Sequence, residues 1–401
     1  MVGEWASCTY KTVPWRQQVR AGSKEDRMVR SIKVCIPSHI ADRTFRLDSQ
    51  LASRSESATN SISKLDNAFG STLKSLDRLL IRTESISSSK IENLHASSEE
   101  YARALYGNAS NASAVAMVAG TNALISLIDS VNTEKAITAS ALKKAHFTLM
   151  NGVPREKVTA GEYRQVQNWI DGSNHSPLSA IFVPPPPEIV EGLMEDLMIF
   201  ANRDDLPVLL QAAVAHAQFE TIHPFTDGNG RIGRALVNAI FRRREITTRT
   251  VVPVASFLVA DRNAYFENLG AYREGNVENL LSSFISAAHY ASVESQRTAE
   301  TLSGLNLFWT KKLGTIRSGS STSKLLDILI SNPVFSAEEL LGIIGKHPAS
   351  IYNAISKMFS VGILTPLSDR KRNQIWGVVD ILQELEDLDR RIAIRGRVNL
   401  R

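Results

Sequence analysis

Cysteine is scarce in this sequence, and its longest apolar stretch is interrupted. Cys8 and Cys35 are the two cysteines among 401 residues, too few and too close to one end for a disulfide framework or a four-ligand zinc site. Residues 112–131 contain Gly, Thr, Asn and Asp, whereas a membrane-spanning helix needs about 20 nearly continuous apolar residues. We therefore expect two free thiols, a buried helix at residues 112–131, no membrane partner and a cytoplasmic location.

The chain also lacks a strong excess of one charge and a signal-peptide core. Its 46 Lys and Arg residues against 41 Asp and Glu residues give a net charge of +5, too weak to indicate a nucleic-acid partner by itself. Residues 1–16 include Glu4, Lys11 and Pro14 and contain no apolar segment of the length that directs export. With 43% hydrophobic and 22% charged residues, the chain is typical of a globular protein with two or three domains.

Apolar residues recur at three- and four-residue steps along most of the chain, which predicts a mostly α fold. Residues 209–222 are apolar nearly all round, as expected of a central buried helix. A short extended stretch is expected around residues 32–37. Residues 173–187 combine a polar turn, a strand-like run and four prolines, which predicts a short β-hairpin flap.

Changes in this pattern divide the chain into three parts. We expect an N-terminal helical region at residues 1–110, a catalytic core at 111–300 and a C-terminal domain at 301–401. The C-terminal part has three short helical periodicities followed by two strand-like runs, the layout of a winged helix-turn-helix. Residues 350–361 would be its recognition helix and residues 370–372 its wing contacts to DNA, and docking of a protein is the alternative.

The stretch that carries chemistry runs from His223 to Arg234, HPFTDGNGRIGR, between two helical segments. Gly228, Asn229 and Gly230 tolerate backbone angles that let successive N–H groups turn inward into an anion-binding nest. The positive N-terminal end of the following helix points into the same nest. Phosphate is therefore the expected guest.

Charged side chains accompany this nest. Arg231 and Arg234 are three residues apart and add forked donors for phosphate oxygens. Asp227 offers the carboxylate that a protein commonly contributes to Mg²⁺ beside a polyphosphate, and His223 can accept a proton from an attacking hydroxyl near neutral pH. The residues predict phosphoryl or nucleotidyl transfer.

The same stretch resembles the signature of the Fic family, His-x-Phe-x-Asp/Glu-Gly-Asn-Gly-Arg-x-x-Arg, at every fixed position. Members of that family are helical, and most transfer AMP from ATP to a side-chain hydroxyl of a target protein. The resemblance implies ATP and Mg²⁺, with His223 as general base, Phe225 as the anchor of the loop and Asp227 as the Mg²⁺ ligand. It assigns the phosphates to Gly228, Asn229, Gly230, Arg231 and Arg234, and places Asn229 and Arg231 with His223 in the catalytic set.

Three shorter stretches agree with that resemblance. Gly161-Glu162-Tyr163-Arg164 and residues 178–187 resemble the segment that leads into the family's flap, a hairpin that positions the target's backbone. Tyr265-Phe266 resembles an aromatic pair that borders the adenine, and core packing is the alternative for Tyr265. Ser88-Ser89-Lys90-Ile91-Glu92-Asn93 resembles the family's autoinhibitory motif, Ser/Thr-x-x-x-Glu-Gly/Asn.

The inhibitory motif also has a physical interpretation. Ser88 and Glu92 are four residues apart and share one face of a helix, and a carboxylate presented to Arg234 would form a forked ion pair. ATP would then bind with its γ-phosphate deprived of a donor, and its α-phosphate would be out of line for attack. A purely structural ion pair is the alternative.

For two other groups of residues we prefer a structural interpretation to a binding site. His216, Glu220 and His223 are spaced like a helical metal triad, but Pro224 ends the helix and the zincin order is absent, so no zinc is predicted. Residues 242–244 are three arginines at a helix end, which favour a solvated cap over nucleic-acid binding.

Together these observations predict a protein adenylyltransferase, autoinhibited by Glu92, that modifies Ser, Thr or Tyr hydroxyls of target proteins and of itself. Family analogy makes a homodimer reasonable. The alternatives are a DNA-binding regulator with a nucleotide-sensing site, and a Fic enzyme that removes AMP or transfers another nucleotide.

Overall fold

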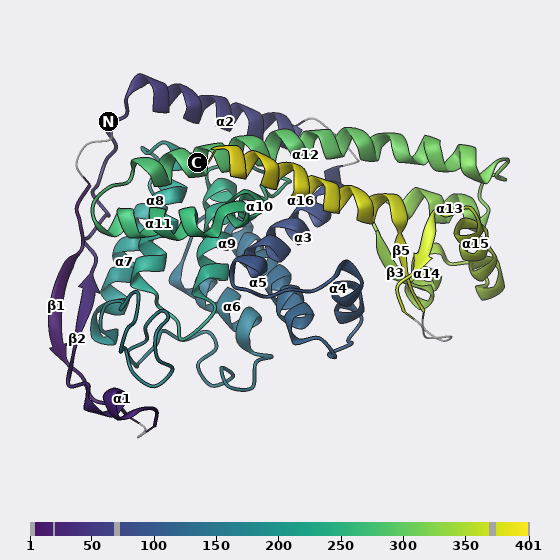
Figure 1. The fold of residues 1–401 in the computed structure, drawn as a ribbon. Coiled ribbons are helices and arrows are strands. Elements are labelled where there is room, and N and C mark those ends of the chain that lie inside the picture. Colours follow the sequence, from purple (N-terminus) through teal and green to yellow (C-terminus); the bar gives the residue numbers. More distant parts are fainter. Residues whose placement is uncertain (1–4, 19–20, 68–72, 369–373, 400–401) are drawn as a thin grey trace.

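Helices make up most of the molecule, with two small antiparallel sheets at its edges (Figure 1). This computed structural model describes the chain except residues 1–4, 19–20, 68–72, 369–373 and 400–401. The predicted mostly α fold is confirmed. Cys8 and Cys35 are both free thiols, as predicted.

The central body is a layered bundle around one hydrophobic core. Its middle helix is buried from Leu209 to Ile222, which confirms the prediction for this apolar stretch. The helices of the body are α3 (Leu73–Ile91), α4 (Ser98–Leu105), α5 (Ala112–Glu134), α6 (Ala139–Met150), α7 (Val190–Ala201), α8 (Val208–Ile222), α9 (Asn229–Arg243), α10 (Val254–Leu258) and α11 (Arg262–Arg273), with short turns of 3₁₀ helix at Pro187–Ile189 and Val259–Asp261.

Within the described part of the chain, α5 is the one helix long and apolar enough to cross a membrane. It packs instead against α3, α4, α6 and α9. Met117, Leu124 and Leu127 on α5 are buried, and Leu124 and Leu127 belong to the main core. A soluble core helix passes the same test of length and composition, and this packing agrees with the buried helix that we predicted.

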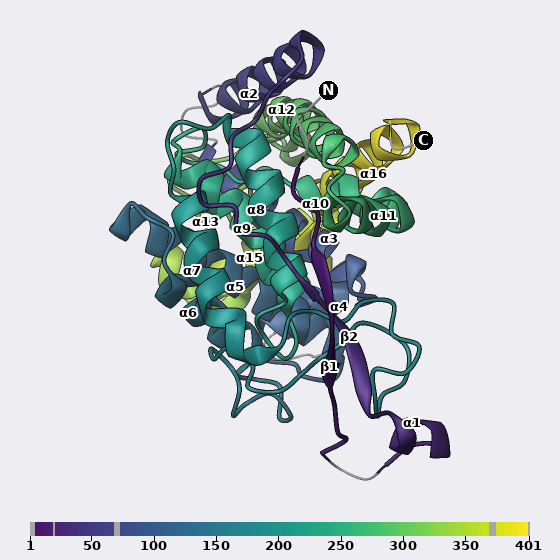
Figure 2. The ribbon, with the colours of Figure 1, turned by 90° about the vertical axis from the view of Figure 1, so that its left-hand side faces the viewer.

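The N-terminal residues form a two-stranded sheet. The extended stretch predicted around residues 32–37 is its second strand, and the first strand was not predicted. Strands β1 (Thr9–Pro14) and β2 (Ser31–Ile36) are antiparallel, with Tyr10 opposite Cys35. The short helix α1 (Lys24–Met28) lies at the far end of this hairpin (Figure 2). The helix α2 (Ser49–Asn67) follows and packs along α12.

The flap is shorter than predicted, because its pairing consists of one β-bridge, between Ile170 and Phe182. The four residues after Val183 are prolines, which have no N–H group and cannot extend a ladder. The N-terminal hairpin contacts the flap instead, since the Cys35 N–H on β2 donates to the Val183 carbonyl at 2.9 Å.

The C-terminal part begins on the long helix α12 (Glu278–Leu313), and the boundary predicted at residue 301 lies inside this helix. Residues 321–378, here called the C-terminal module, follow with three helices and a sheet of order β3-β5-β4. The last helix, α16 (Val379–Asn399), runs back along α12 to the central body (Figure 1). The module contains α13 (Ser321–Ile328), β3 (Val334–Ser336), α14 (Ala337–Ile344), α15 (Pro348–Ser360), β4 (Leu364–Pro366) and β5 (Ile375–Val378). The predicted wing contacts at residues 370–372 lie outside the described residues.

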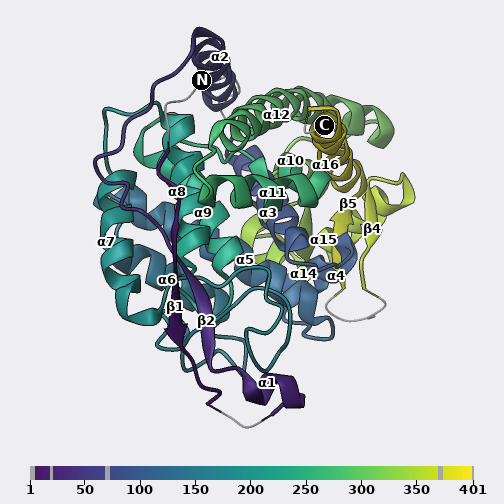
Figure 3. The same cartoon turned by 60° about the vertical axis from the view of Figure 1, so that its left-hand side comes forward.

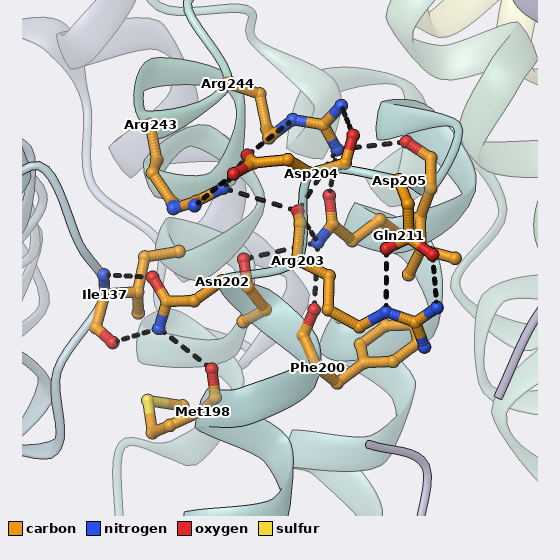
Figure 4. Close-up of polar contacts among 12 residues, drawn as sticks. Ile137, Met198, Phe200, Asn202, Arg203, Asp204, Asp205, Gln211, Arg243 and Arg244 are labelled. Atoms are coloured by element: carbon orange, nitrogen blue, oxygen red, sulfur yellow. Dashed lines mark hydrogen bonds and ion pairs between the residues drawn. The ribbon is translucent and has the colours of Figure 1, made fainter. Parts of the chain in front are cut away.

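The three arginines at the end of α9 bind the protein itself. Arg243 forms an ion pair with Asp204 at 2.7 Å, and Arg244 donates to Gln211 Oε1 at 2.7 Å (Figure 4). Arg242 donates to the carbonyls of Thr248 and Thr250. The predicted solvated cap is therefore corrected: the side chains of Arg243 and Arg244 are 11% and 17% exposed, and they fix the end of α9 against the corner between α7 and α8.

Candidate functional site

The loop between α8 and α9 folds around a short chain reversal. His223 ends α8 in the left-handed conformation, at φ 50° and ψ 60°. Gly228 caps α9 at φ 74°, where a side chain would be strained and would also meet Leu149 and Met150. The Asn229 side chain accepts from the Phe225 N–H and donates to the Phe225 carbonyl, both at 2.9 Å. The Asn229 amide therefore holds the shape of the loop.

Phe225 and His146 anchor this loop in the core. The two rings are both buried and stack with centroids 3.8 Å apart, as expected for the anchoring role of Phe225. His146 Nδ1 accepts from the Gly161 N–H at 2.8 Å, which assigns the proton to Nε2, 3.0 Å from the Asp227 carbonyl. Sequence reasoning missed this positioning role of His146 because both of its partners are main-chain groups distant in sequence.

His223 is half-buried and electrostatically held as a neutral base. Burial, then the positive charges of Arg164 and Arg273, lower the pKa of His223 to about 4, while the Glu220 carbonyl and Glu92 act in the opposite direction. At neutral pH the imidazole therefore has a lone pair available for a proton.

Arg234 is buried at the centre of the site and binds the predicted inhibitory motif. Its Nε donates to Ser88 Oγ and its Nη2 to the Ser88 carbonyl, each at 2.8 Å. The same Nη2 lies 2.7 Å from Glu92 Oε1. The predicted fork is thus corrected: one carboxylate oxygen contacts the guanidinium, because Ser88 binds Nε and shares Nη2 while Nη1 faces the Tyr265 hydroxyl. Helix α3 ends at Ile91, so Glu92 lies in the turn that follows.

The Glu92 carboxylate lies directly over the start of α9. A side chain at Gly230 would collide with Glu92 Oε1, so Glu92 lies where the helix N-terminus favours an anion. Burial would raise the pKa of Glu92, but Arg234 and Arg231 together lower it. The same ion pair raises the pKa of Arg234 in spite of its burial. Glu92 is therefore a charged carboxylate in the predicted phosphate position.

Arg231 and Asp227 border the nest without being committed to each other. Arg231 Nε is buried and has no hydrogen-bond partner among the described residues. Asp227 is exposed, and its Oδ1 accepts from the Gly228 N–H at 2.5 Å. A single exposed carboxylate beside an anion nest fits a Mg²⁺ ion that takes its other ligands from phosphates and water. Elsewhere in the described part, no group of three or more His, Cys, Asp or Glu side chains could hold a metal.

Tyr265 is a buried partner of Arg234. It is 1% exposed, and its hydroxyl lies 2.9 Å from His216 Nε2 and 3.4 Å from Arg234 Nη1. Its neighbour Phe266 is 46% exposed. The predicted adenine contact at Tyr265 stays a prediction, and Phe266 is the member of the pair with an accessible ring.

Helix α3, which carries the inhibitory motif, is also held from the C-terminal side. Asp389 on α16 accepts from Ser87 at 3.0 Å and forms an ion pair with Lys90 at 2.9 Å. Glu84 accepts from the Ala255 N–H on α10 at 2.8 Å. Figure 3 shows α3 with α10 and α16 close by.

Comparison with known proteins agrees with this geometry. A model described as the Fic/DOC family matches residues 136–241, which contain the whole loop from His223 to Arg234. Residues 136–241 form a Fic domain. In the fold, this Fic domain runs from just before α6 to the last turn of α9.

Curated relatives of the chain include adenylyltransferases. Protein adenylyltransferase Fic of Nematostella vectensis is 30% identical over 157 residues, 38% of this chain and 33% of that protein. Protein adenylyltransferase fic-1 of Caenorhabditis elegans is 30% identical over 121 residues, 29% of this chain and 22% of that protein. The chain therefore spans a third or less of the length of these relatives.

A solved structure shares the fold around the Fic domain. A Fic family protein from Desulfovibrio desulfuricans G20 has a TM-score of 0.55 at 19% identity, and the match covers 84% of this chain and 98% of that one. The likeness supports the mostly helical fold, including regions outside residues 136–241.

Proposed function

We propose that the chain is a protein adenylyltransferase that uses ATP. The observation that carries this proposal is a neutral imidazole beside an anion nest: the pKa of His223 is lowered to about 4, and the nest at the start of α9 has Arg231 and Arg234 beside it. His223 takes the proton from a Ser, Thr or Tyr hydroxyl of a target. The hydroxyl oxygen then bonds to the α-phosphorus of ATP, the bond from that phosphorus to the bridging oxygen breaks, and pyrophosphate leaves.

Mg²⁺ fits this proposal as a partner of the nucleotide. Asp227 would hold the ion, which would offset negative charge on the phosphates. The donors that the chain itself supplies are the N–H groups at the start of α9 and the guanidinium groups of Arg231 and Arg234. Such preorganised donors each contribute a few kcal/mol, about 10² or more in rate.

Glu92 would inhibit this reaction. Its carboxylate contacts Arg234 at 2.7 Å and lies against Gly230, so a phosphate group must displace it to reach the same donors. The Glu92 side chain is 37% exposed whereas that of Arg234 is 1% exposed. A partly exposed acid on a buried arginine can leave without opening the core.

The test is incubation of the purified Glu92→Gly protein with Mg·ATP, followed by intact mass spectrometry of the protein. In parallel, the protein is added to a lysate with labelled ATP, and label on polypeptides is measured. We expect AMP on the protein itself or on other polypeptides, more than with the wild type, and none with Glu92→Gly/His223→Ala. Equal labelling by wild type and Glu92→Gly would contradict inhibition, and no labelling by either would contradict the activity. Competition with all four nucleoside triphosphates, and incubation with AMP-modified protein, distinguish the alternative Fic chemistries.

DNA binding by the C-terminal module is a second candidate function. The exposed face of α15 carries Tyr352, Asn353, Ser356 and Lys357, with no acidic side chain. Polar and basic side chains on one helix face suit a major groove. A gel shift with random-sequence duplex at low salt, compared with Asn353→Glu/Lys357→Glu, tests this function. Equal mobility shifts for both proteins would contradict it.

A further inference from the structure

The flap and the catalytic loop meet at Arg164, a side chain that is 1% exposed. Its Nε donates to the His223 carbonyl at 2.9 Å and its Nη2 to the Ile222 carbonyl at 3.3 Å. On the flap side, Nη2 donates to the Pro185 carbonyl at 2.5 Å and Nη1 to the Val166 carbonyl at 3.2 Å. One guanidinium therefore contacts the catalytic histidine and both ends of the flap.

Main-chain groups are the only hydrogen-bond acceptors found for this guanidinium within the described residues, and no ion pair with a carboxylate is found for it there. The carbonyls of Ile222 and His223 end α8, where a helix has unpaired acceptors and a partial negative charge. An arginine suits this place because its rigid fork reaches several acceptors at once. The charge of Arg164 is thus held by dipoles and is not neutralised.

His223 depends on its backbone for its position. Its left-handed backbone conformation is uncommon for a residue with a side chain, and its buried Nδ1 has no hydrogen-bond partner in the described part of the chain. The His223 carbonyl, by contrast, is bound by Arg164, and the Arg164 N–H donates to the Pro224 carbonyl at 2.9 Å. Arg164 therefore contacts the backbone on which the imidazole is mounted.

We propose that Arg164 is the positioning residue of this site, which fixes the His223 backbone against the flap. The proposal rests on the proposed function for its effect on transfer. Arg164 itself makes no contact with substrate in this proposal. It acts on His223 through the main chain and through its charge.

The charged surroundings of His223 give this proposal a measurable consequence. The charged groups that face the imidazole are Arg164 from the start of the flap, Arg273 from α11 and Glu92 after α3, and the main-chain carbonyl of Glu220 on α8 faces it as well. After burial, Arg164 has the largest effect, and it lowers the pKa of His223. Removing this one positive charge must raise that pKa, and removing its fork must loosen the backbone.

Two variants separate charge from geometry. Arg164→Gln removes the charge, whereas Arg164→Lys keeps the charge but cannot reach carbonyls on both segments. The control is Arg203→Gln, because Arg203 also donates to two carbonyls, those of Ala41 and Arg43, but takes no part in the site. All are made in the Glu92→Gly background, so that inhibition does not mask transfer.

The first measurement is an NMR titration of the His223 ring from about pH 3.5 to 8, a range that includes the pKa of about 4 to which burial and positive charge lower this group. We expect Arg203→Gln and Arg164→Lys to keep the midpoint of the parent, and Arg164→Gln to raise it by about one unit or more. The second is transfer kinetics, in which both Arg164 variants lower kcat by about 10- to 100-fold while KM for ATP changes less than about 3-fold.

An unchanged His223 titration in Arg164→Gln together with unchanged kcat per folded molecule would overturn the proposal. So would a loss of thermal stability alone, with neither quantity altered. If Arg164→Gln does not fold, Arg164→Lys decides by its kcat. If the parent transfers no AMP at all, the proposed function fails, while the His223 titration still tests the role of Arg164.

Discussion

Arg164 and Arg234 are both 1% exposed, and they are bound in different ways. Arg234 contacts two side-chain hydroxyls, a carbonyl and the carboxylate of Glu92. Arg164 contacts four carbonyls. A carboxylate can be exchanged for a phosphate of the same charge, whereas a main-chain carbonyl cannot leave without unfolding its segment. The carboxylate partner of Arg234 is therefore exchangeable, whereas the carbonyl partners of Arg164 are permanent.

The difference follows from what each arginine connects. Arg234 lies where α9 meets the end of α3, and the acid there is a partly exposed side chain in a turn. Arg164 lies between the C-terminus of α8 and the flap, where the available acceptors are backbone groups. Charge on the partner thus distinguishes a binding position from a structural junction.

The first prediction concerns ATP affinity. Glu92→Gly removes the competitor for Arg234, and Arg164→Gln leaves that position untouched. An ion pair of one buried and one partly exposed side chain stabilises the bound carboxylate by about 1.4 kcal/mol. Loss of this competitor corresponds to about 10-fold in ATP affinity. Calorimetric titration with Mg·ATP should therefore show about 10-fold tighter binding for Glu92→Gly and no change for Arg164→Gln.

Asp205→Asn is the control for that measurement, because Asp205 pairs with Arg203 at 2.6 Å on the surface, outside the site, and carries the same charge. Its affinity should equal that of the wild type. Equal affinity of Glu92→Gly and the wild type would mean that Arg234 is not built for exchange.

A second prediction tests how tightly Glu92 lies on the nest. Gly230→Ala places a Cβ against Glu92 Oε1 in the wild type but mainly against Arg234 Nη1, at 3.0 Å, once Glu92 is removed. Overpacking of this kind costs about 1–3 kcal/mol. Thermal unfolding should show a lower Tm for Gly230→Ala in the wild type and a smaller loss in the Glu92→Gly background. Equal losses in both backgrounds would contradict the placement of the Glu92 carboxylate over Gly230.

The exchangeable arginine was predictable from sequence, and the permanent one was not. The spacing within the loop placed Arg234 at the nest, and the Ser88–Glu92 spacing placed an acid opposite it, because both are local patterns. The partners of the Arg164 guanidinium are carbonyls of residues 166, 185, 222 and 223, and any residue type supplies a carbonyl. No side-chain pattern could therefore identify them.

The same reason explains the errors around the flap. The flap's β-hairpin was overestimated, since one bridge is formed. The N-terminal hairpin that supports it could not be predicted from residues 1–37, because its contacts join distant segments. Cys35 donates to Val183, and Ser176 donates to Asp26 at 2.6 Å. Helix α8, in contrast, was predicted from its composition alone, because burial on all sides leaves a sequence pattern.

A third prediction asks whether the exchange at Arg234 depends on α16. Asp389 holds Ser87 and Lys90 on the helix that presents Glu92. Asp389→Asn removes the ion pair but keeps an acceptor, and should increase AMP transfer a few-fold, about 1 kcal/mol or less. The control is Asp387→Asn on the same helix, where Asp387 pairs with Arg390. Equal transfer by both variants would show that α3 holds Glu92 in place without α16.

A fourth prediction is a pH dependence at the buried end of α3. Burial raises the pKa of Glu84 to about 8, so the folded protein retains this proton at pH values where the unfolded chain, with a pKa near 4.5, has lost it. Stability must then fall as pH rises from about 4.5 to about 8, and stay level above that.

Glu84→Gln removes this pH-dependent contribution to stability while keeping an acceptor for the Ala255 N–H. Between pH 5.5 and 8, thermal unfolding should show a smaller decrease of Tm for Glu84→Gln than for the wild type, whereas the exposed Glu99→Gln should follow the wild type. Parallel pH profiles for wild type and Glu84→Gln would contradict a Glu84 side chain that keeps its proton at neutral pH.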